Sequence, residues 1–185
     1  MADSSRRAVL RAQTAKPHAA LEDRVGALRS RPAYVRYLRG SFAFRAPYEA
    51  ALSGLAWPTR PGDWRPTLIV RDLAGDLTDL GAVPPSPGYG VSFGGRESLF
   101  GALYVLEGSS LGARIIYKDA LRLGFTSTFG ARHLASQARS LETWKGFLAL
   151  LETAEGLDLP SVVQSANAVF EAAAQSFLEV DHDGE

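Results

Sequence analysis

The sequence predicts an all-α protein with a single domain. Apolar residues recur every three or four positions over six long stretches, which is the spacing of amphipathic helices. No stretch alternates apolar and polar residues as a strand does, and there is no internal repeat. With 185 residues, of which 46% are hydrophobic, the chain can bury one sizeable core and is short for two domains. We assign residues 1–180 to this domain and expect residues 181–185 to form a disordered tail.

The first predicted helix covers residues 9–29. Its apolar face consists of positions spaced by three or four, namely Leu10, Thr14, His18, Leu21, Val25 and Leu28. This pattern places His18 on the buried face of the helix. Pro17 removes a hydrogen bond inside a helix, so we expect the residues before it to form a separate turn.

Two helices and two loops follow. Pro32 marks a break, and residues 34–52 form a helix that is rich in aromatic side chains. Residues 54–66 contain proline and glycine and are predicted to be a loop that Trp57 and Trp64 pin to the core. A shorter helix is predicted over residues 68–80. The loop at residues 81–95, with the run PPSPGYG, is expected to be the most mobile segment.

The central predicted helix covers residues 99–118, with the sequence LFGALYVLEGSSLGARIIYK. It contains Gly101, Gly108 and Gly112, although each glycine inside a helix costs about 1 kcal/mol relative to alanine. Together with Tyr104 these glycines share one face, which leaves a nearly bare strip of backbone. Such a strip has two interpretations: close packing against another helix, or a planar cofactor lying against the backbone.

The last third of the chain is predicted to contain two more helices. The run GFTSTFGA after Leu121 is rich in turn residues and indicates a connection. Helices are predicted over residues 141–154 and 160–180. Asp158 is the expected N-cap of the second of these, and Pro160 lies in its first turn.

The composition excludes several classes of function. Lysine plus arginine equals aspartate plus glutamate at 20 each, and no basic cluster contains interleaved aromatic residues, so we expect neither nucleic acid nor a membrane as partner. The longest apolar run is about eight residues, too short for a membrane span. The absence of cysteine excludes disulfides, iron–sulfur clusters and thiolate ligands. The N-terminal residues do not resemble a signal peptide, which predicts a cytoplasmic protein.

Histidine and carboxylates remain as metal ligands. Of His18, His133 and His182, only His18 lies on a predicted apolar helical face, where it is either a hydrogen-bonded core residue or a ligand. Glu22 follows one helical turn later and can accept the Nδ1 proton of His18, which leaves Nε2 free to bind iron. Arg11 lies two turns before His18 and either faces the acidic groups of a ligand or is solvated.

Two blocks of the sequence are distinctive. The first is the set Thr14, His18, Leu21 and Glu22, and the second is YVLEGSSLGA at residues 104–113. Both resemble the bacterial haem oxygenases, and the resemblance is greatest to the short forms associated with bacterial phytochromes and haem uptake. It implies a helical fold that holds haem b between the first helix and the glycine-rich helix. It also implies cleavage of haem, which is both cofactor and substrate, by O2 to biliverdin, carbon monoxide and ferrous iron.

The resemblance also implies partners. The chain has no flavin or nicotinamide motif, so the electrons come from an external donor such as a ferredoxin or a reductase. A bacteriophytochrome is an expected acceptor of biliverdin. Lys118 matches a position where some members have a basic residue facing the electron donor.

On the proximal side, His18 matches the iron ligand and Glu22 the carboxylate that orients it. Arg11 and Tyr104 match positions that contact the haem propionates. Phe170 or Phe177, on the last helix, is expected to close the edge of the pocket.

On the distal side, Gly108 and Gly112 match the glycines that let the helix kink over the haem and leave room for O2. Many members have an aspartate directly after the first of these glycines, where this chain has Ser109. A serine hydroxyl can hold a water but cannot act as an anionic anchor. The predicted catalytic group is therefore Gly108, Ser109 and Gly112.

Other functions fit parts of the sequence. A haem-binding or sensor protein on the same fold would keep His18 and the glycines without turnover. A diiron enzyme needs several carboxylate and histidine ligands, and a thiamin-degrading enzyme generally needs a cysteine that this chain lacks. A purely structural helical module predicts that His18→Ala changes stability alone.

Overall fold

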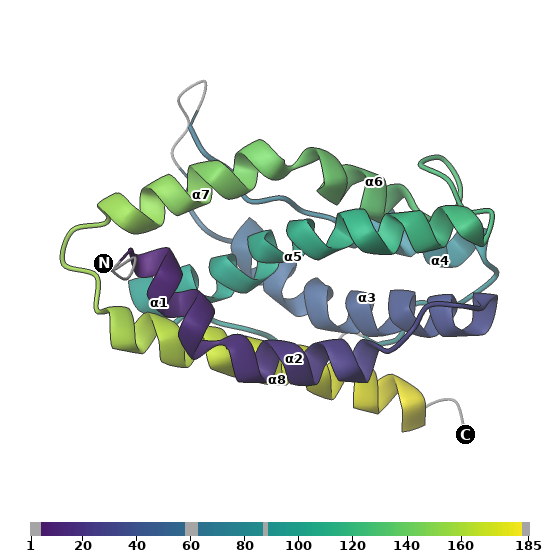
Figure 1. The fold of residues 1–185 in the computed structure, drawn as a ribbon, viewed down its shortest axis with the longest axis horizontal. Coiled ribbons are helices and arrows are strands. Elements are labelled where there is room, and N and C mark those ends of the chain that lie inside the picture. The colour runs from purple at the N-terminus through teal and green to yellow at the C-terminus, as the bar shows by residue number, and fades with distance from the viewer. Residues whose placement is uncertain (1–4, 58–62, 87–88, 183–185) are drawn as a thin grey trace.

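The structure is a computed structural model that describes residues 5–57, 63–86 and 89–182. In this part of the chain it contains eight helices and no strand beyond isolated bridges at Thr126, which confirms the all-α prediction (Figure 1). The helices are α1 (Arg6–Gln13), α2 (Ala15–Val25), α3 (Arg31–Ser53), α4 (Val70–Asp79), α5 (Arg96–Arg122), α6 (Arg132–Arg139), α7 (Leu141–Thr153) and α8 (Leu159–His182).

The first predicted helix is divided in two at Thr14. Thr14 ends α1 and precedes α2, and its hydroxyl donates to the Leu10 carbonyl at 2.8 Å. Pro17 is the third residue of α2, a position in the first turn where a missing N–H leaves no hydrogen bond unmade. The separate segment predicted before Pro17 is therefore the helix α1.

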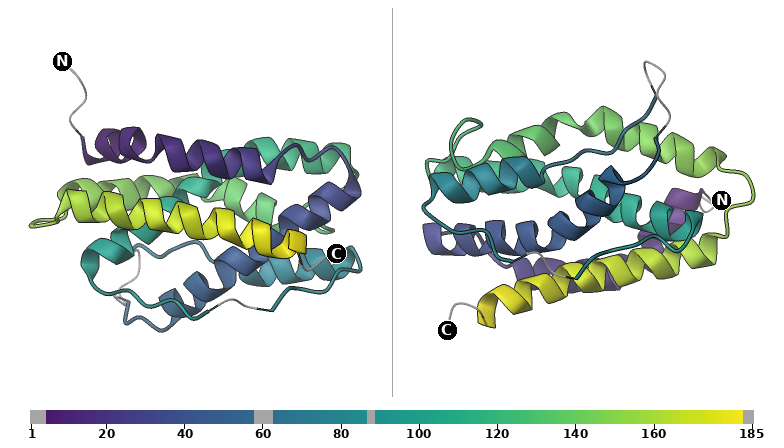
Figure 2. Two further views of the ribbon diagram at one scale, coloured as in Figure 1. Left: turned by 90° about the horizontal axis from the view of Figure 1, so that it is seen from below. Right: turned by 180° about the vertical axis from the view of Figure 1, so that it is seen from behind.

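The 27-residue helix α5 runs through the centre of the molecule and packs against α8, α6, α7 and α3 (Figures 1 and 2). Its N-terminal half belongs to an apolar cluster that includes Leu106, Phe147 and Phe170. Its C-terminal half contributes Ala113 and Ala120 to a second apolar cluster. Leu21 of α2 packs against both clusters, so they form one core and support a single domain.

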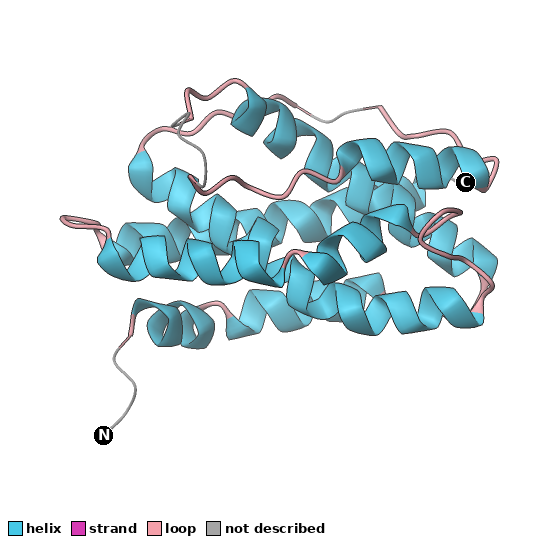
Figure 3. Cartoon of the chain, turned by 90° about the horizontal axis from the view of Figure 1, so that it is seen from above, coloured by secondary structure: helices cyan, strands magenta, loops and turns pink. Residues whose placement is uncertain are grey.

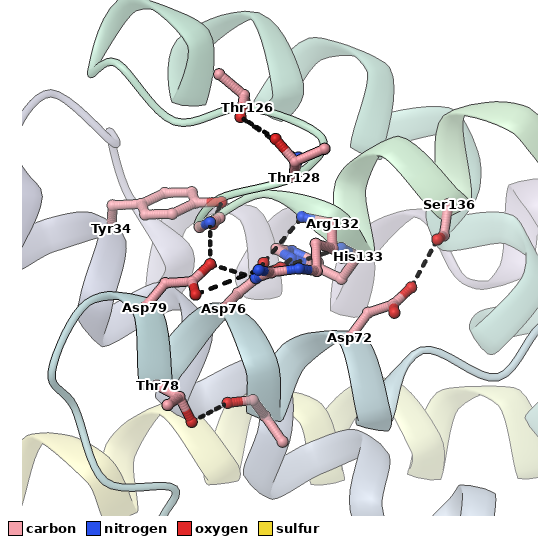
Figure 4. A network of polar contacts seen from close by, with 12 residues as sticks. Tyr34, Asp72, Asp76, Thr78, Asp79, Thr126, Thr128, Arg132, His133 and Ser136 are labelled. Atoms are coloured by element: carbon pink, nitrogen blue, oxygen red, sulfur yellow. Dashed lines mark hydrogen bonds and ion pairs between the residues drawn. The ribbon is translucent and has the colours of Figure 1, made fainter.

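The helix α6 was not predicted, because its eight residues contain few apolar side chains and polar contacts hold it in place. Figure 4 shows Asp76 and Asp79 of α4 facing Arg132 and His133 of α6. His133 is completely buried, and its Nδ1 lies 2.7 Å from Asp76 Oδ2. The expectation that only His18 lies on an apolar face is therefore wrong. Burial lowers the pKa of His133, and the Asp76 carboxylate partly offsets this effect.

Most of the loops and helix ends lie where the sequence predicts them (Figure 3). Trp57 donates its indole N–H to the Leu52 carbonyl at 2.8 Å, and Trp64 donates to the Thr143 carbonyl at the same distance, so both indoles pin their loop to the core as predicted. At the start of α8, Asp158 accepts from the Ser161 amide at 3.2 Å, as an N-cap does. The helix continues through Asp181, which pairs with Arg36, to His182, so the first two residues of the tail predicted at 181–185 are helical. Residues 183–185 lie outside the described part of the chain.

One helix also meets the length and hydropathy of a membrane span. This helix is α5, and half of its most apolar window is buried inside the protein. Burial of that kind is typical of a core helix.

Candidate functional site

The candidate site lies between α2 and the C-terminal half of α5. Both helices pack along α8, and neither α2 nor α5 covers the other extensively (Figures 1 and 2). None of the residues of α2 is buried. The side of α2 that carries His18 is therefore available to a ligand.

His18 is exposed, with 54% of its side chain accessible, so the prediction that it is buried is wrong. The predicted apolar stripe assumed one continuous helix, but its only buried members are Leu10 in α1, Thr14 between α1 and α2, and Leu28 after α2. Among the described residues the His18 ring makes no hydrogen bond, and its Nδ1 lies 3.6 Å from Glu22 Oε1. This distance is longer than a hydrogen bond, and both groups are solvated. His18 and Glu22 therefore lie close to each other, as predicted, but do not form the predicted hydrogen bond.

The last helix contributes one of the two predicted phenylalanines to this site. The ring of Phe170 meets the His18 ring edge to face, with the centroids 5.4 Å apart. Phe177 lies elsewhere, against Gly40 of α3 and stacked 6.5 Å from the Tyr37 ring. Phe170 therefore forms the edge of the site, and Phe177 does not.

The three glycines of α5 have different surroundings. A Cβ on Gly101 would lie 2.6 Å from Ser165 Cβ and 2.8 Å from the backbone of α8, so this glycine permits close helix packing. A Cβ on Gly108 would meet the Trp144 ring at 3.6 Å, an ordinary contact. Around Gly112 there is no atom within 4 Å of such a Cβ. The bare strip predicted over residues 101–112 is therefore open only toward its C-terminal end.

Tyr104 lies on α5 near the junction of α1 and α2. Burial raises the pKa of its hydroxyl, while Thr14, Arg7 and Arg11 nearby lower it. Arg11 is exposed on α1, and Lys118 is exposed further along α5. Arg11 and Tyr104 are thus neighbours, as a shared contact with acidic ligand groups requires.

Ser109 is exposed, but its hydroxyl already has partners. Its Oγ donates to the Leu106 carbonyl at 2.7 Å and accepts from Gln137 Nε2 at 2.7 Å. The sequence offered no signal for Gln137, because the helix α6 that carries it was not predicted.

A buried group of charges below α5 also escaped sequence analysis. Arg45 and Glu49 of α3 form an ion pair with 3.2 Å between Arg45 Nε and Glu49 Oε1, and Arg45 Nη1 donates to the Leu106 carbonyl at 3.2 Å. Glu107 accepts from the Thr67 amide at 2.6 Å and from the Thr67 hydroxyl at 3.0 Å. Burial raises the pKa of Glu107 and lowers that of Arg45. Arg45 and Glu49 are four residues apart on the apolar face of a predicted helix, and this spacing was the signal in the sequence for a buried ion pair.

The site fits a metal that arrives inside a planar ligand. The described residues contain no group of three or more histidine and carboxylate side chains that could hold an ion. His18 supplies one imidazole with an available nitrogen, which suits a single axial ligand of haem iron. Phe170 supplies an aromatic edge, and the backbone at Gly112 permits close approach of a flat ring.

Comparisons with known proteins identify the family of the chain. The chain is 33% identical over 173 residues to the heme oxygenase PigA of Pseudomonas aeruginosa, with 84% of each protein covered. Its fold matches that of the NO- and CO-bound heme oxygenase of Neisseria meningitidis with a TM-score of 0.72 and 24% identity, covering 96% of this chain and 92% of the other. No family model matches the sequence. The identity to PigA over most of both chains shows that this protein belongs to the bacterial haem oxygenase family.

Proposed function

We propose that this protein is a haem oxygenase that cleaves haem b to biliverdin, carbon monoxide and ferrous iron with O2 and external electrons. The observation that carries the proposal is an available imidazole, His18, on α2 together with the open backbone at Gly112 on α5, two helices that both pack against α8. Family membership supports the activity.

The residues of α2 hold the proximal side. His18 is positioned to bind iron through Nε2, and Glu22 to accept the Nδ1 proton once the ring turns toward it from 3.6 Å. A neutral imidazole held by a carboxylate is a basic ligand that keeps a fixed orientation. When bound, haem supplies the iron that activates O2 and the ring carbon that becomes oxidised.

The residues of α5 shape the distal side. The open backbone at Gly112 leaves room for a small gas, and Gly108 presents only its half-buried backbone beside Trp144. No charged side chain stands at positions 108, 109 or 112 to cleave an O–O bond as a distal histidine or arginine does in peroxidases. These residues therefore favour oxidation of the ring.

Arg11 and Tyr104 are proposed to bind the propionates, since they lie close together at the start of the site. Lys118 is exposed and is proposed to face an acidic electron donor, a ferredoxin or a reductase. We further propose a cytoplasmic location and a bacteriophytochrome as one acceptor of biliverdin.

The decisive experiment is an absorption titration of the purified protein with hemin, followed by addition of ascorbate or a ferredoxin system in air. We expect a stoichiometric Soret band that decays while the absorption of biliverdin grows. In His18→Ala the band should be lost or weak, with unchanged melting temperature because the side chain is exposed. A normal spectrum and full turnover in this variant would exclude His18 as the ligand.

The second candidate is a haem-binding or sensor protein without turnover. The bond that commits the Ser109 hydrogen to the Leu106 carbonyl favours it, because a distal hydroxyl whose hydrogen is engaged donates none to a ligand. A stable Soret band without bilin under reducing conditions would support this alternative.

A further inference from the structure

The hydroxyl of Ser109 has an unusual set of partners for an exposed side chain. A serine hydroxyl has one hydrogen to donate and two lone pairs that can accept. The Leu106 carbonyl takes the hydrogen at 2.7 Å, and Gln137 Nε2 occupies one lone pair at 2.7 Å. One lone pair remains, on a residue that is exposed beside the open backbone of Gly112.

We propose that Gln137 is a positioning residue: its bond to Ser109 Oγ holds the hydroxyl in the orientation in which its hydrogen points to the Leu106 carbonyl, so that the remaining lone pair accepts toward the distal side. The inference rests on the proposed function and adds a residue of α6 to the site. In this arrangement Ser109 accepts a hydrogen bond from a water and cannot donate one.

Both partners of Ser109 are held firmly. Gln137 is only 5% exposed, and its backbone carbonyl accepts from the Ser140 hydroxyl at 2.8 Å. At the other end of α6, the amides of Arg132 and His133 donate to Asp76 at 2.9 and 3.0 Å. The side chain of Gln137 therefore projects from an anchored helix. Because this side chain is also buried, it loses little further conformational entropy when its amide bonds to Ser109.

The Leu106 carbonyl is fixed from the opposite side. Arg45 Nη1 donates to it at 3.2 Å, and Arg45 is itself held by the ion pair with Glu49. The carbonyl therefore accepts from a buried cation as well as from the Ser109 hydroxyl. These contacts keep the hydroxyl hydrogen turned toward the helix backbone.

The arrangement accounts for serine at this position. An ionised aspartate, which many members have after the first distal glycine, is an acceptor only. Ser109 reaches the same acceptor-only state through Gln137 and Leu106, without a charge. A water that donates to Ser109 keeps a second hydrogen for another acceptor in the site.

The test compares Gln137→Met with the control Ser110→Ala in the hemin-loaded full chain. Methionine keeps the approximate length of glutamine without a donor. Ser110 is buried and donates to the Glu107 carbonyl at 2.7 Å, the same local bond as that of Ser109, whereas the Gln137 side chain donates to Ser109. The readouts are the melting temperature, the pH midpoint at which ferric haem exchanges water for hydroxide, and the rate of bilin formation.

In Gln137→Met we expect the pH midpoint to fall by about half a unit and bilin to form roughly fivefold more slowly, as one hydrogen bond allows. The midpoint falls because a Ser109 hydroxyl that Gln137 no longer holds can turn from the Leu106 carbonyl and donate to hydroxide, whereas a hydroxyl that only accepts favours water, the stronger donor. Ser109→Ala should give the same shift, and the double variant no additional one. Ser110→Ala should leave the midpoint unchanged.

Ser109→Asp provides a second check that does not depend on the folding of Gln137→Met. Because an aspartate accepts without help, Gln137→Met added to Ser109→Asp should not lower the midpoint further. An unchanged midpoint in a folded Gln137→Met overturns the inference, whatever Ser109→Ala shows, as does a shift of equal size in Ser110→Ala. Absence of a Soret band in the wild-type protein would instead overturn the proposed function.

Discussion

The two halves of α5 carry glycines at helical spacing but use them in opposite ways. In the N-terminal half, Gly101 lets the backbone of α8 approach to within 2.8 Å of where a Cβ would lie. In the C-terminal half, a Cβ on Gly112 would have no neighbour within 4 Å. Close helix packing is therefore confirmed at Gly101, and the open surroundings of Gly112 leave room for the other interpretation, a planar ligand. Spacing shows that glycines share a face, and only the neighbouring helix determines what that face contacts.

The largest effect is expected from a side chain at Gly101. Gly101→Leu should lower the free energy of unfolding by more than about 3 kcal/mol, since Ser165, Ala166 and the Val162 carbonyl leave no space for even one carbon. Urea denaturation measures the change. Unaltered stability would show that α8 does not pack on α5 at this point.

The matched substitution in the other half should affect function instead. Gly112→Leu has open space, so stability should stay unchanged or rise by up to about 1 kcal/mol through helix propensity. Bilin formation should fall by roughly 30-fold, about 2 kcal/mol in activation free energy, because leucine fills the distal side. Full turnover would mean that no substrate lies against this half of the helix.

Acid should destabilise α6, the helix that packs against the C-terminal half of α5, and leave α8 unaffected. Since burial lowers the pKa of His133, the unfolded chain binds its proton first as the pH falls through about 6.5. Stability then decreases by up to about 1.4 kcal/mol per pH unit below that value. Hydrogen exchange between pH 7 and pH 5 should show α6 losing protection before α8. In His133→Gln this pH dependence should flatten, and equal loss in both helices would refute the assignment.

The smallest effects are expected from alanine at the two glycines of the site, Gly108 and Gly112. Gly112→Ala should stabilise the protein by up to about 1 kcal/mol. Gly108→Ala should give a similar or smaller gain, because its Cβ meets Trp144 at 3.6 Å without a clash. Thermal melting compares the two. A loss of stability at position 112 would contradict its open surroundings.

The sequence predicted the elements that have long apolar periods or strong caps. The stretch at 99–118, the N-cap Asp158 and the break before Pro17 depend on local rules, and the structure contains each of them. The comparison with PigA confirms the family that two short blocks indicated. The roles of His18, Glu22 and the glycines remain predictions.

What escaped prediction depends on contacts between distant segments. His133, Gln137 and Arg45 have their positions set by Asp76, Ser109 and the Leu106 carbonyl, all at least 28 residues away in the chain. No local pattern records such pairs. The prediction that His18 is buried was wrong for a related reason: α8 packs against α2 but leaves every residue of α2 at least partly exposed.

The break at Thr14 separates an anchored helix from a weakly held one. Arg6 fastens α1 to the end of α7 through the Leu151 and Ala154 carbonyls at 2.6 and 2.7 Å, whereas α2 buries no residue. Local unfolding should therefore be easiest in α2, with Thr14 as the hinge. A flat apolar substrate bound by His18 would add the buried area that α2 lacks. An opened tetrapyrrole is no longer flat, so the reaction itself would remove this buried area. Contact of α2 with the ligand would then weaken once the ring has been cleaved.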